Sequence, residues 1–334
     1  MKRFLQISIG LLLSGFFAYL AVKDIQWNEF FITLQKNKQW WYLLPASGLF
    51  LASFISRALR WGYLVEPVQK VAFKPLFSSL MIGYMGNNVL PLRLGEILRA
   101  YALGRKTGLS KSTGLATIVV ERLVDIVGLL IFLVVAIFVA PIPEKYQTAT
   151  LLIGGFALLL LLFLLGLTFF EEFTKNLTEK FFAFFPEKIS SRLEEIVVSF
   201  IQGLKGLRST HNYGKIFLQT VILWILYATS TYCMLAAFEF PTLYGMTIWS
   251  AIVILLIGTV GVMIPSSPGY IGTYHYVIEQ ALAIYSVPAE PALGFAIVIH
   301  LINYIPVTGL GLYFFLREGL RFKEIPDSQE VLPE

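Results

Sequence analysis

Six long apolar stretches constrain the fold of this 334-residue chain more than any other feature of its sequence. A helix needs about 20 apolar residues to cross the hydrocarbon core of a bilayer. The stretches that reach this length are Phe4–Val22, Trp40–Leu64, Thr113–Ala140, Thr148–Phe170, Ile216–Phe238 and Pro291–Leu316. Only 14% of the residues are charged, whereas a soluble domain carries about 25%. The sequence therefore predicts an all-α integral membrane protein, and its net charge of +5 does not indicate a nucleic-acid partner.

The chain divides into two apolar halves around one polar segment. We expect a single membrane domain over residues 1–320, with halves at 1–170 and 216–316, and a short polar tail at 321–334. Within the segment 171–215, apolar residues recur at three- and four-residue spacing opposite charged ones, which predicts an amphipathic helix. This helix either lies on the cytoplasmic membrane surface or packs against the cytoplasmic ends of the other helices.

Two further apolar segments are interrupted by proline and glycine. Leu76–Leu103 is broken at Pro91, and Met246–Val287 is broken at Pro265–Gly269. If the N-terminus is inside and Leu76–Leu103 enters and leaves on one side, 21 of the 26 lysines and arginines lie inside and 4 outside, with Arg122 in the membrane. Loops rich in Lys and Arg stay in the cytoplasm, so we expect a re-entrant first hairpin and cytoplasmic termini. Met246–Val287 begins and ends outside, either as a second re-entrant hairpin or as two crossings, which would give eight or more spans.

The two broken segments resemble each other. Each contains Ile-Gly-x-x-Gly, then a proline, then a glycine four residues further on; the glycines and prolines are Gly83, Gly86, Pro91 and Gly95 in the first segment and Gly258, Gly261, Pro265 and Gly269 in the second. Segments that enter from opposite faces are typical of inverted-repeat transporters, whose sites lie where broken helices meet. A chance match is the alternative, because both residue types are common in membrane helices. Broken backbone at membrane depth needs protein or a water-filled cavity around it, so we predict a cavity between the two hairpins.

Charged residues follow the first break. Arg93, Glu96 and Arg99 are three residues apart and share one face of the second arm if that arm is helical. The planar fork of arginine suits phosphate, and the backbone amides at a broken helix add affinity for anions. We interpret these residues as a phosphate or headgroup site in which Glu96 holds an arginine in place. Ordinary charge at the membrane surface is the alternative.

A second group of charges lies inside the third full-length stretch. Glu121, Arg122 and Asp125 fall near the expected midplane of that helix, where each charge costs about 2.5–3.5 kcal/mol on insertion scales. Asp125 lies three residues after Arg122 and can neutralise it. We interpret the group as an ionic cluster that binds substrate or relays protons. A structural ion pair between packed helices is the alternative.

The second break is polar rather than charged. We include Pro265, Gly269, Tyr274 and His275 among the candidate substrate-binding residues, and His275 could carry a proton or contact a headgroup. His300 and Asn303 lie one turn apart before Pro306, and hydrogen bonds between helices would explain them equally well.

Signatures of several enzyme classes are absent from the sequence. It contains no Walker A motif, no GxSxG, no HExxH and no Cys/His cluster at metal-binding spacing. We therefore expect no cofactor, no metal and no ATP-driven domain. Any transport would run downhill or be coupled to an ion or to the membrane potential.

Three ordered motifs resemble those of a known family. They are Gly-Tyr-x-x-Asn-x-x-x-Pro-x-Arg-x-Gly-Glu-x-x-Arg from Gly83, Glu-Arg-x-x-Asp from Glu121, and Pro-x-x-Pro-Gly-x-x-Gly-Thr from Pro265. Together they resemble the lysylphosphatidylglycerol synthase transmembrane region, also called the flippase-like domain family of prokaryotes, over nearly the whole chain. Larger members continue into a cytoplasmic aminoacyltransferase domain. Because this chain ends at Glu334, we expect a stand-alone membrane member.

The resemblance implies a lipid flippase of the prokaryotic cytoplasmic membrane. Its substrate would be a phospholipid with an anionic headgroup or a polyprenyl-phosphate-linked lipid, with Arg93, Arg99 and Arg122 on the phosphate. Partner enzymes of lipid or glycan synthesis are also implied. Two departures from the family pattern bear on headgroup preference: Tyr270 stands where many relatives carry glycine, and His275 where many carry glutamate.

Two other functions remain open at this point. One is a membrane-embedded transferase acting on a lipid headgroup, with Glu96 or Glu121 as the base. The other is an accessory or scaffold subunit of a lipid or glycan pathway.

Overall fold

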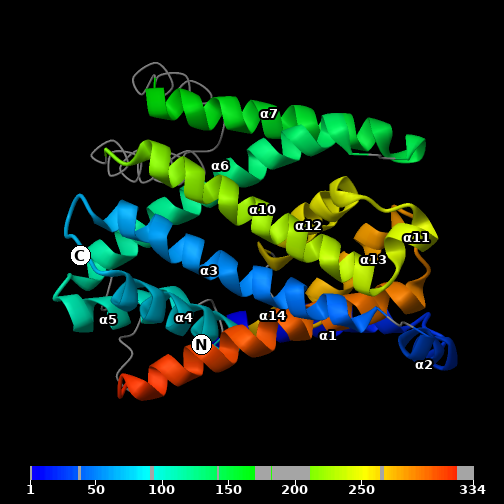
Figure 1. Ribbon diagram of the computed structural model, residues 1–334, viewed down its shortest axis with the longest axis horizontal. Coiled ribbons are helices and arrows are strands. Elements are labelled where there is room, and N and C mark those ends of the chain that lie inside the picture. Colours follow the sequence, from blue (N-terminus) through cyan, green and yellow to red (C-terminus); the bar gives the residue numbers. More distant parts are fainter. Residues whose placement is uncertain are drawn as a thin grey trace.

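The computed structural model describes residues 2–36, 39–90, 94–140, 143–169, 182, 211–263 and 267–321. This part of the chain is almost entirely helical and contains no β-strand, which confirms the predicted all-α fold (Figure 1). Its helices are α1 (Lys2–Val22), α2 (Trp27–Lys36), α3 (Leu43–Val65), α4 (Phe73–Val89), α5 (Gly95–Thr107), α6 (Lys111–Val139), α7 (Gln147–Phe169), α10 (Tyr213–Ala237), α11 (Phe240–Tyr244), α12 (Ile248–Met263), α13 (Thr273–Ala283) and α14 (Ala289–Arg317), with 3-10 turns η1 (Trp40–Tyr42), η3 (Glu144–Tyr146) and η4 (Pro268–Tyr270). Arg93, Pro265 and most of the segment 171–215 lie outside the described residues.

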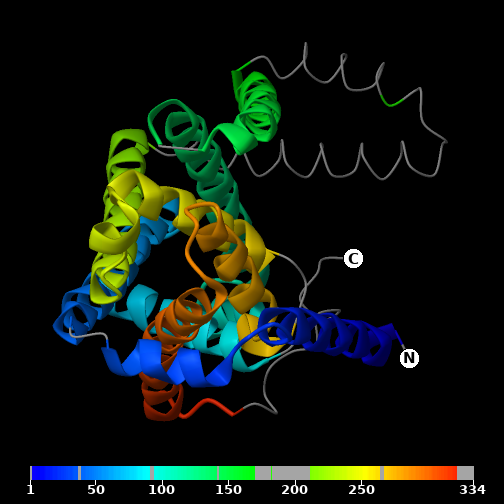
Figure 2. The same cartoon turned by 90° about the vertical axis from the view of Figure 1, so that its right-hand side faces the viewer.

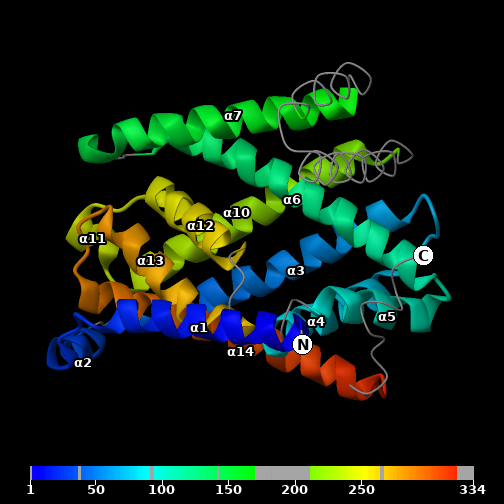
Figure 3. The same ribbon diagram turned by 180° about the vertical axis from the view of Figure 1, so that it is seen from behind.

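Five of the six predicted spans are helices long and apolar enough to cross a membrane. They are Trp40–Val65, Lys111–Val139, Glu144–Phe163, Tyr213–Ala237 and Ala289–Arg317. The first predicted span forms α1, a helix of 21 residues. Figure 2 shows α1 projecting away from the bundle at its N-terminal end, and Figure 3 shows it from behind, where it runs beside α13. Five long helices of this composition make the chain a multi-pass membrane protein.

Helix α7 lies on the outside of the bundle, against α6 (Figure 2). Its outer surface exposes large apolar side chains, among them Leu151, Leu152, Phe156 and Leu159. Exposed apolar surface of this extent is unusual for a soluble protein and suits contact with lipid. The helix is therefore held to the rest of the protein mainly through one neighbour.

The two broken segments form two helical hairpins that approach from opposite ends of the molecule. The first is α4 and α5, with 17 and 13 residues, and the second is α12 and α13, with 16 and 11 residues. Each helix is shorter than the roughly 20 residues that a crossing needs. Figure 1 shows α4 and α5 near the end of the molecule where α14 finishes, and α12 and α13 toward the end that carries α11. Between these ends α4 contacts η4 of the second hairpin, and the Tyr304 hydroxyl of α14 donates to the Asn88 carbonyl of α4 at 3.3 Å.

Contacts between helices occur in pairs that a two-fold repeat would produce. Let α3, α4, α5 and α6 of the first half correspond in order to α10, α12, α13 and α14 of the second. The contact of α4 with α14 is then equivalent to the contact of α12 with α6. The contact of α5 with α6 is likewise equivalent to the contact of α13 with α14. Likewise α3 with α4 matches α10 with α12, while α3 and α10 contact each other. The predicted repeat therefore extends beyond the hairpins to a full-length helix on either side of each.

Aromatic packing positions the second half. Phe238 contacts both Phe240 and Phe295 with ring centroids 5.5 Å apart, and Phe240 lies 5.6 Å from Phe295. These three rings belong to one buried apolar cluster with residues of α12 and α13. Aromatic pairs at this separation each contribute about 0.5–1.5 kcal/mol beyond their buried area. The first half contains a charged cluster, described below.

Glycines bring the arms of the first hairpin into close contact. A Cβ atom at Gly95 would lie 2.0 Å from the Gly83 carbonyl oxygen and 2.4 Å from the Asn87 amide nitrogen. A Cβ at Gly86 would in turn lie 2.7 Å from the Gly95 Cα. No side chain fits at these separations, so glycine at both positions sets how closely α4 and α5 pack.

We expect Gly95→Ala to destabilise the protein, because the added methyl group overlaps backbone atoms that cannot rotate away. Overpacking in a filled core costs about 1–3 kcal/mol, and backbone overlap places this substitution at the upper end. The thermal unfolding midpoint of the purified protein in detergent measures the effect. Gly48→Ala is the matched control, because a Cβ there meets nothing within 4 Å. Equal midpoints for the two variants would contradict the close contact.

Candidate functional site

A cavity of about 540 Å³ lies between the two hairpins. Its lining comes from both halves of the protein: α3, α4, α5 and α6 on one side, and α10, α12, η4, α13 and α14 on the other. This confirms the predicted cavity between the hairpins. Its volume falls in the range of about 300–1,000 Å³ that is usual for sites binding small molecules.

The wall contributed by the first half is charged. Arg57 from α3, Glu96 from α5, and Arg122 and Asp125 from α6 all line the cavity. The Arg122 Nε donates to Glu96 Oε1 at 2.9 Å, and its Nη1 donates to Asp125 Oδ2 at 3.3 Å. Arg57 Nη1 donates to the same Asp125 oxygen at 2.7 Å. Arg122 is the most open of the four, with 33% of its side chain exposed.

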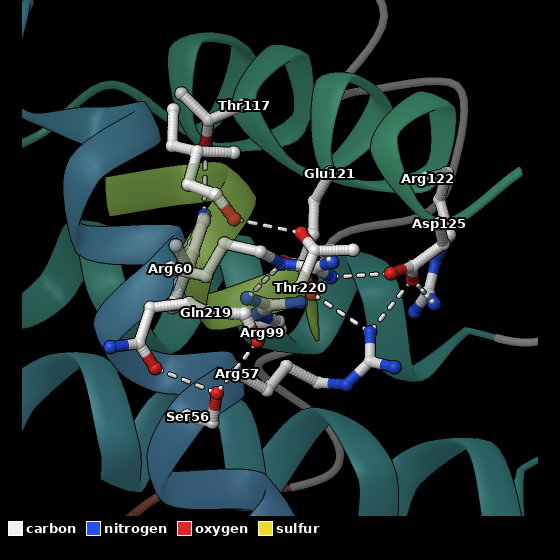
Figure 4. Close-up of polar contacts among 12 residues, drawn as sticks. Ser56, Arg57, Arg60, Arg99, Thr117, Glu121, Arg122, Asp125, Gln219 and Thr220 are labelled. Atoms are coloured by element: carbon white, nitrogen blue, oxygen red, sulfur yellow. Dashed lines mark hydrogen bonds and ion pairs between the residues drawn. The ribbon is translucent and has the colours of Figure 1, made fainter. Parts of the chain in front are cut away.

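A second layer of charges lies behind this wall (Figure 4). The Glu121 side chain is fully buried and accepts from Arg99 Nη2 at 2.6 Å and Arg57 Nη1 at 3.1 Å, while Arg60 Nη2 lies 3.6 Å away. Arg60 also donates to Asp125. Three arginines from two helices thus surround one carboxylate. Such a cluster is stable in an apolar interior only when nearly every charge is paired.

The charged layers join α3, α5 and α6 into one unit. The Arg99 guanidinium lies 3.7 Å from the centroid of the Trp61 ring of α3, in addition to its pairing with Glu121 of α6. Trp61 Nε1 donates to Thr117 Oγ1 of α6 at 3.1 Å. These contacts hold the second arm of the hairpin against both full-length helices of its half.

One of the sequence predictions about this group is confirmed, because Asp125 pairs with Arg122. Glu96 was expected to hold an arginine of its own arm, and the structure pairs it with Arg122 of the neighbouring helix α6 instead. Arg99 is placed differently from the phosphate-contacting position that the resemblance implies. Its side chain is 2% exposed and faces Glu121 and Trp61, outside the described lining of the cavity. Glu121 also lies outside that lining. Both residues support the wall instead of forming it.

Sequence reasoning missed Arg57 and Arg60. The orientation argument counted them with the cytoplasmic loop cations, and the structure places them within α3 with 7% and 0% of their side chains exposed. Counting these two arginines as membrane residues instead still leaves most lysines and arginines on the inside, so the predicted orientation is unchanged. A signal was present, because both lie inside the predicted span Trp40–Leu64 and are three residues apart, on one face of a helix.

The described part of the wall contributed by the second half carries polar side chains but no charged ones. Gly269, Tyr274, His300, Asn303 and Tyr304 line it. Gly269 has a φ of 71°, and a Cβ there would lie 2.8 Å from the Tyr304 ring, so the turn η4 needs glycine at this position. Two of the predicted site residues, Gly269 and Tyr274, thus belong to the cavity lining. Tyr270 lines the cavity as well.

His275 lies outside the described lining and contacts it through another histidine. Its Nε2 is 2.9 Å from His300 Nδ1, and His300 lines the cavity. The sequence was compatible with either a functional or a structural role for His300 and Asn303. Their place in the cavity wall favours the functional one.

The two walls use equivalent positions of the repeat. Arg122 and His300 are each the twelfth residue of their helices, α6 and α14, and Asp125 and Asn303 are each the fifteenth. Glu96 and Tyr274 are each the second residue of α5 and α13, and Arg57 and Tyr227 are each the fifteenth of α3 and α10. All eight line the cavity. At each position the first half carries a charge and the second half a neutral polar side chain.

Several archaeal proteins resemble this chain over most of its length. A UPF0104 membrane protein of Methanothermobacter thermautotrophicus is 26% identical over 294 residues, which cover 82% of this chain and 83% of the relative. A UPF0104 membrane protein of Pyrococcus horikoshii is 24% identical over 317 residues, covering 89% and 91%. A protein of Haloferax volcanii named glycosyltransferase AglD is 22% identical over 282 residues, which cover 75% of this chain but 44% of that protein.

One family matches nearly the entire chain. Residues 7–311 match the family described as the lysylphosphatidylglycerol synthase TM region. The match includes both hairpins and all eight of the equivalent cavity positions. The chain belongs to the lysylphosphatidylglycerol synthase transmembrane region family.

Proposed function

We propose that this chain is a lipid translocator, not an enzyme, and that it moves a lipid with an anionic headgroup across the prokaryotic cytoplasmic membrane. The lipid is a phospholipid or a polyprenyl-phosphate-linked lipid. The observation that carries the proposal is an excess of positive charge in the ionic cluster made of the charged cavity wall and the buried layer behind it. Among the described residues, the cluster contains four arginines, Arg57, Arg60, Arg99 and Arg122, and three carboxylates, Glu96, Glu121 and Asp125. An unpaired buried charge is costly, so the cluster favours one bound anion.

The arrangement supports phosphate as that anion. Arg122 is the arginine most open to the cavity, and its remaining donors have the fork geometry that pairs with phosphate oxygens. Glu96 and Asp125 fix the direction of its guanidinium. Arg57 donates beside it from α3. The buried pairs around Glu121 hold this wall rigid, so that little ordering is needed when the headgroup binds.

The rest of the lining supports a lipid as the molecule that carries the phosphate. Apolar and aromatic side chains make up most of it, including Phe50, Phe54, Leu129, Ile254 and Leu255. In the proposed mechanism the hairpins are re-entrant from opposite faces, the termini are cytoplasmic, and one half rocks against the other around the cavity. This movement is the usual form of alternating access in inverted-repeat transporters.

We expect Arg122→Gln to slow lipid translocation by about 10- to 100-fold, because a hydrogen bond to a charged group contributes about 1.5–3 kcal/mol. The measurement is the rate at which a fluorescent phosphatidylglycerol in proteoliposomes becomes accessible to an external quencher. Arg317→Gln is the matched control, since Arg317 lies at the end of α14 and its guanidinium contacts Tyr313 at 3.2 Å, away from the cavity. Wild-type rates in both Arg122→Gln and Arg57→Gln would overturn the proposal.

An accessory role in a lipid or glycan pathway is the second candidate. It is favoured by the relative named glycosyltransferase, because this chain matches 44% of that longer protein. A headgroup transferase would instead convert a lipid itself. Purified chain incubated with lipid and candidate donors should yield no new lipid by mass spectrometry if translocation is the function. Retention of cellular function by a variant lacking Arg57, Glu96, Arg122 and Asp125 would favour the accessory role.

A further inference from the structure

Two histidines contact each other at the uncharged wall. His300 Nδ1 of α14 and His275 Nε2 of α13 are 2.9 Å apart. The rings of Tyr274 and Tyr304 lie 5.4 and 5.6 Å from the His300 ring and place it between them. A neutral imidazole has one donor and one acceptor nitrogen, so this contact holds one proton between two rings. A second proton would give the pair a single positive charge and leave the hydrogen bond in place.

Most ionisable groups on the helices packed around the pair lie outside the cavity lining. Over its described residues α12 carries none. The packed elements carry Tyr274, Tyr276 and Glu279 on α13, Glu290, Tyr304, Tyr313 and Arg317 on α14, Lys2, Arg3 and Tyr19 on α1, Glu29 and Lys36 on α2, Arg57, Arg60 and Tyr63 on α3, Lys74 and Tyr84 on α4, and Tyr213, Lys215, Tyr227, Tyr232 and Cys233 on α10. Of these, Arg57, Tyr84, Tyr227, Tyr274 and Tyr304 also line the cavity. Arg57 is already paired with Glu121 and Asp125.

The repeat relates the histidine pair to the charged wall of the first half. His300 occupies the position in α14 that Arg122 occupies in α6, and Tyr274 and Asn303 occupy those of Glu96 and Asp125. If one half rocks against the other, a headgroup that leaves the first wall reaches the equivalent positions of the second wall. That wall has hydrogen-bond donors but no permanent positive charge.

We propose that His300, Asn303 and Tyr274 form a second subsite for the headgroup phosphate, with its positive charge supplied by a proton that the His275–His300 pair binds. The inference rests on the proposed function, because it assumes a phosphate-bearing lipid in this cavity. One proton enters the pair from water as one phosphate binds, and it leaves to water when the phosphate departs. The lipid and the proton therefore favour each other's binding, and by linkage the effect is reciprocal.

The test measures proton uptake when a lipid binds to the intact protein. The full chain is placed in phosphatidylcholine nanodiscs and titrated with short-chain phosphatidylglycerol, a phosphodiester with a constant charge over the pH range used. Calorimetry in two buffers that differ in ionisation enthalpy gives the number of protons taken up per lipid. We expect up to one proton for the wild type, and an affinity that rises by up to about tenfold for each unit that the pH falls.

Three glutamine variants locate the proton. His300→Gln and His275→Gln should bind the lipid without proton uptake and without the dependence on pH. His211→Gln, which changes the remaining histidine of the chain, should behave as the wild type. His275 lies outside the described cavity lining, so its variant tests the pair even if His300→Gln fails to fold.

The outcomes separate this inference from the function on which it rests. Wild-type binding without proton uptake, or uptake that persists in both His300→Gln and His275→Gln, would overturn the second subsite while leaving a lipid translocator in place. Failure of the wild type to bind or translocate phosphatidylglycerol, with no change in translocation of any phosphate lipid in Arg122→Gln, would overturn both.

Discussion

Glu121→Gln should destabilise the protein more than any other single substitution in the charged cluster. Its carboxylate is fully buried, and three arginines, Arg57, Arg60 and Arg99, lie within 3.6 Å of it. Removing one partner from a buried ionic group costs about 3–5 kcal/mol, because the other charges stay buried without compensation. We expect the thermal unfolding midpoint in detergent to fall on the order of 5–10 °C.

Two further variants test the cause of this loss. Glu96→Gln removes an acid of the same cluster whose side chain is 29% exposed, and should cost much less because water can reach its partner Arg122. The double variant Arg99→Gln with Glu121→Gln should recover part of the stability, since it removes a charge of each sign. Equal midpoints for Glu121→Gln and Glu96→Gln would show that the buried pairs do not carry the stability of this half.

The membrane-length helices could be predicted because each one needs a long apolar run. The predicted span Thr113–Ala140 became α6, Lys111–Val139, and Ile216–Phe238 became α10, Tyr213–Ala237. Helix α2, Trp27–Lys36, was missed because its 10 residues are too few for a span and half of them are polar. Its apolar side, with Phe30 buried, packs against α14. That contact depends on tertiary structure and leaves no pattern as long as a membrane span.

The site could be predicted within a helix but not between helices. Arg122 and Asp125 are three residues apart, so helical geometry alone brings them together. Arg57 reaches Glu121 across 64 residues, and His275 reaches His300 across 25. The spacing of residues defines which face of a helix they share, and it leaves open which other helix packs on that face. The position of Arg57 and Arg60 in a predicted span therefore does not show that they face the carboxylates of α6.

The equivalence of the two cavity walls depends on information from both the sequence and the structure. Glycine and proline spacing indicated that the hairpins repeat, but it aligned Gly95 with Gly269. In the structure, the turn η4 lengthens the second hairpin tip, and α13 begins at Thr273, so Glu96 corresponds to Tyr274. Only this shifted alignment matches the charged side chains of the first wall with neutral polar side chains of the second. In this alignment His300, one of the two paired histidines, matches Arg122.

A covalent cross-link between the two halves should abolish translocation. Asn88 Nδ2 of α4 donates to Thr308 Oγ1 of α14 at 2.8 Å, so cysteines at both positions face each other and can be joined by a short bifunctional methanethiosulfonate reagent once Cys233 is replaced by serine. If one half rocks against the other, the link at the hairpin tip blocks the movement and a reductant restores it. The same fluorescent-lipid assay, before and after reduction, measures this effect, and we expect loss of the whole protein-dependent rate.

A link inside one half is the matched control. A Cβ at Gly114 of α6 would lie 3.3 Å from the Ala100 Cβ of α5, near the 3.5–4.5 Å of disulfides. The ionic cluster already joins α5 to α6 through Arg99 and Glu121. Linking Ala100→Cys to Gly114→Cys should therefore leave translocation unchanged. Full activity in the cross-linked Asn88→Cys/Thr308→Cys protein, with the link verified by mass spectrometry, would exclude movement at this interface and require the lipid to pass through a static cavity.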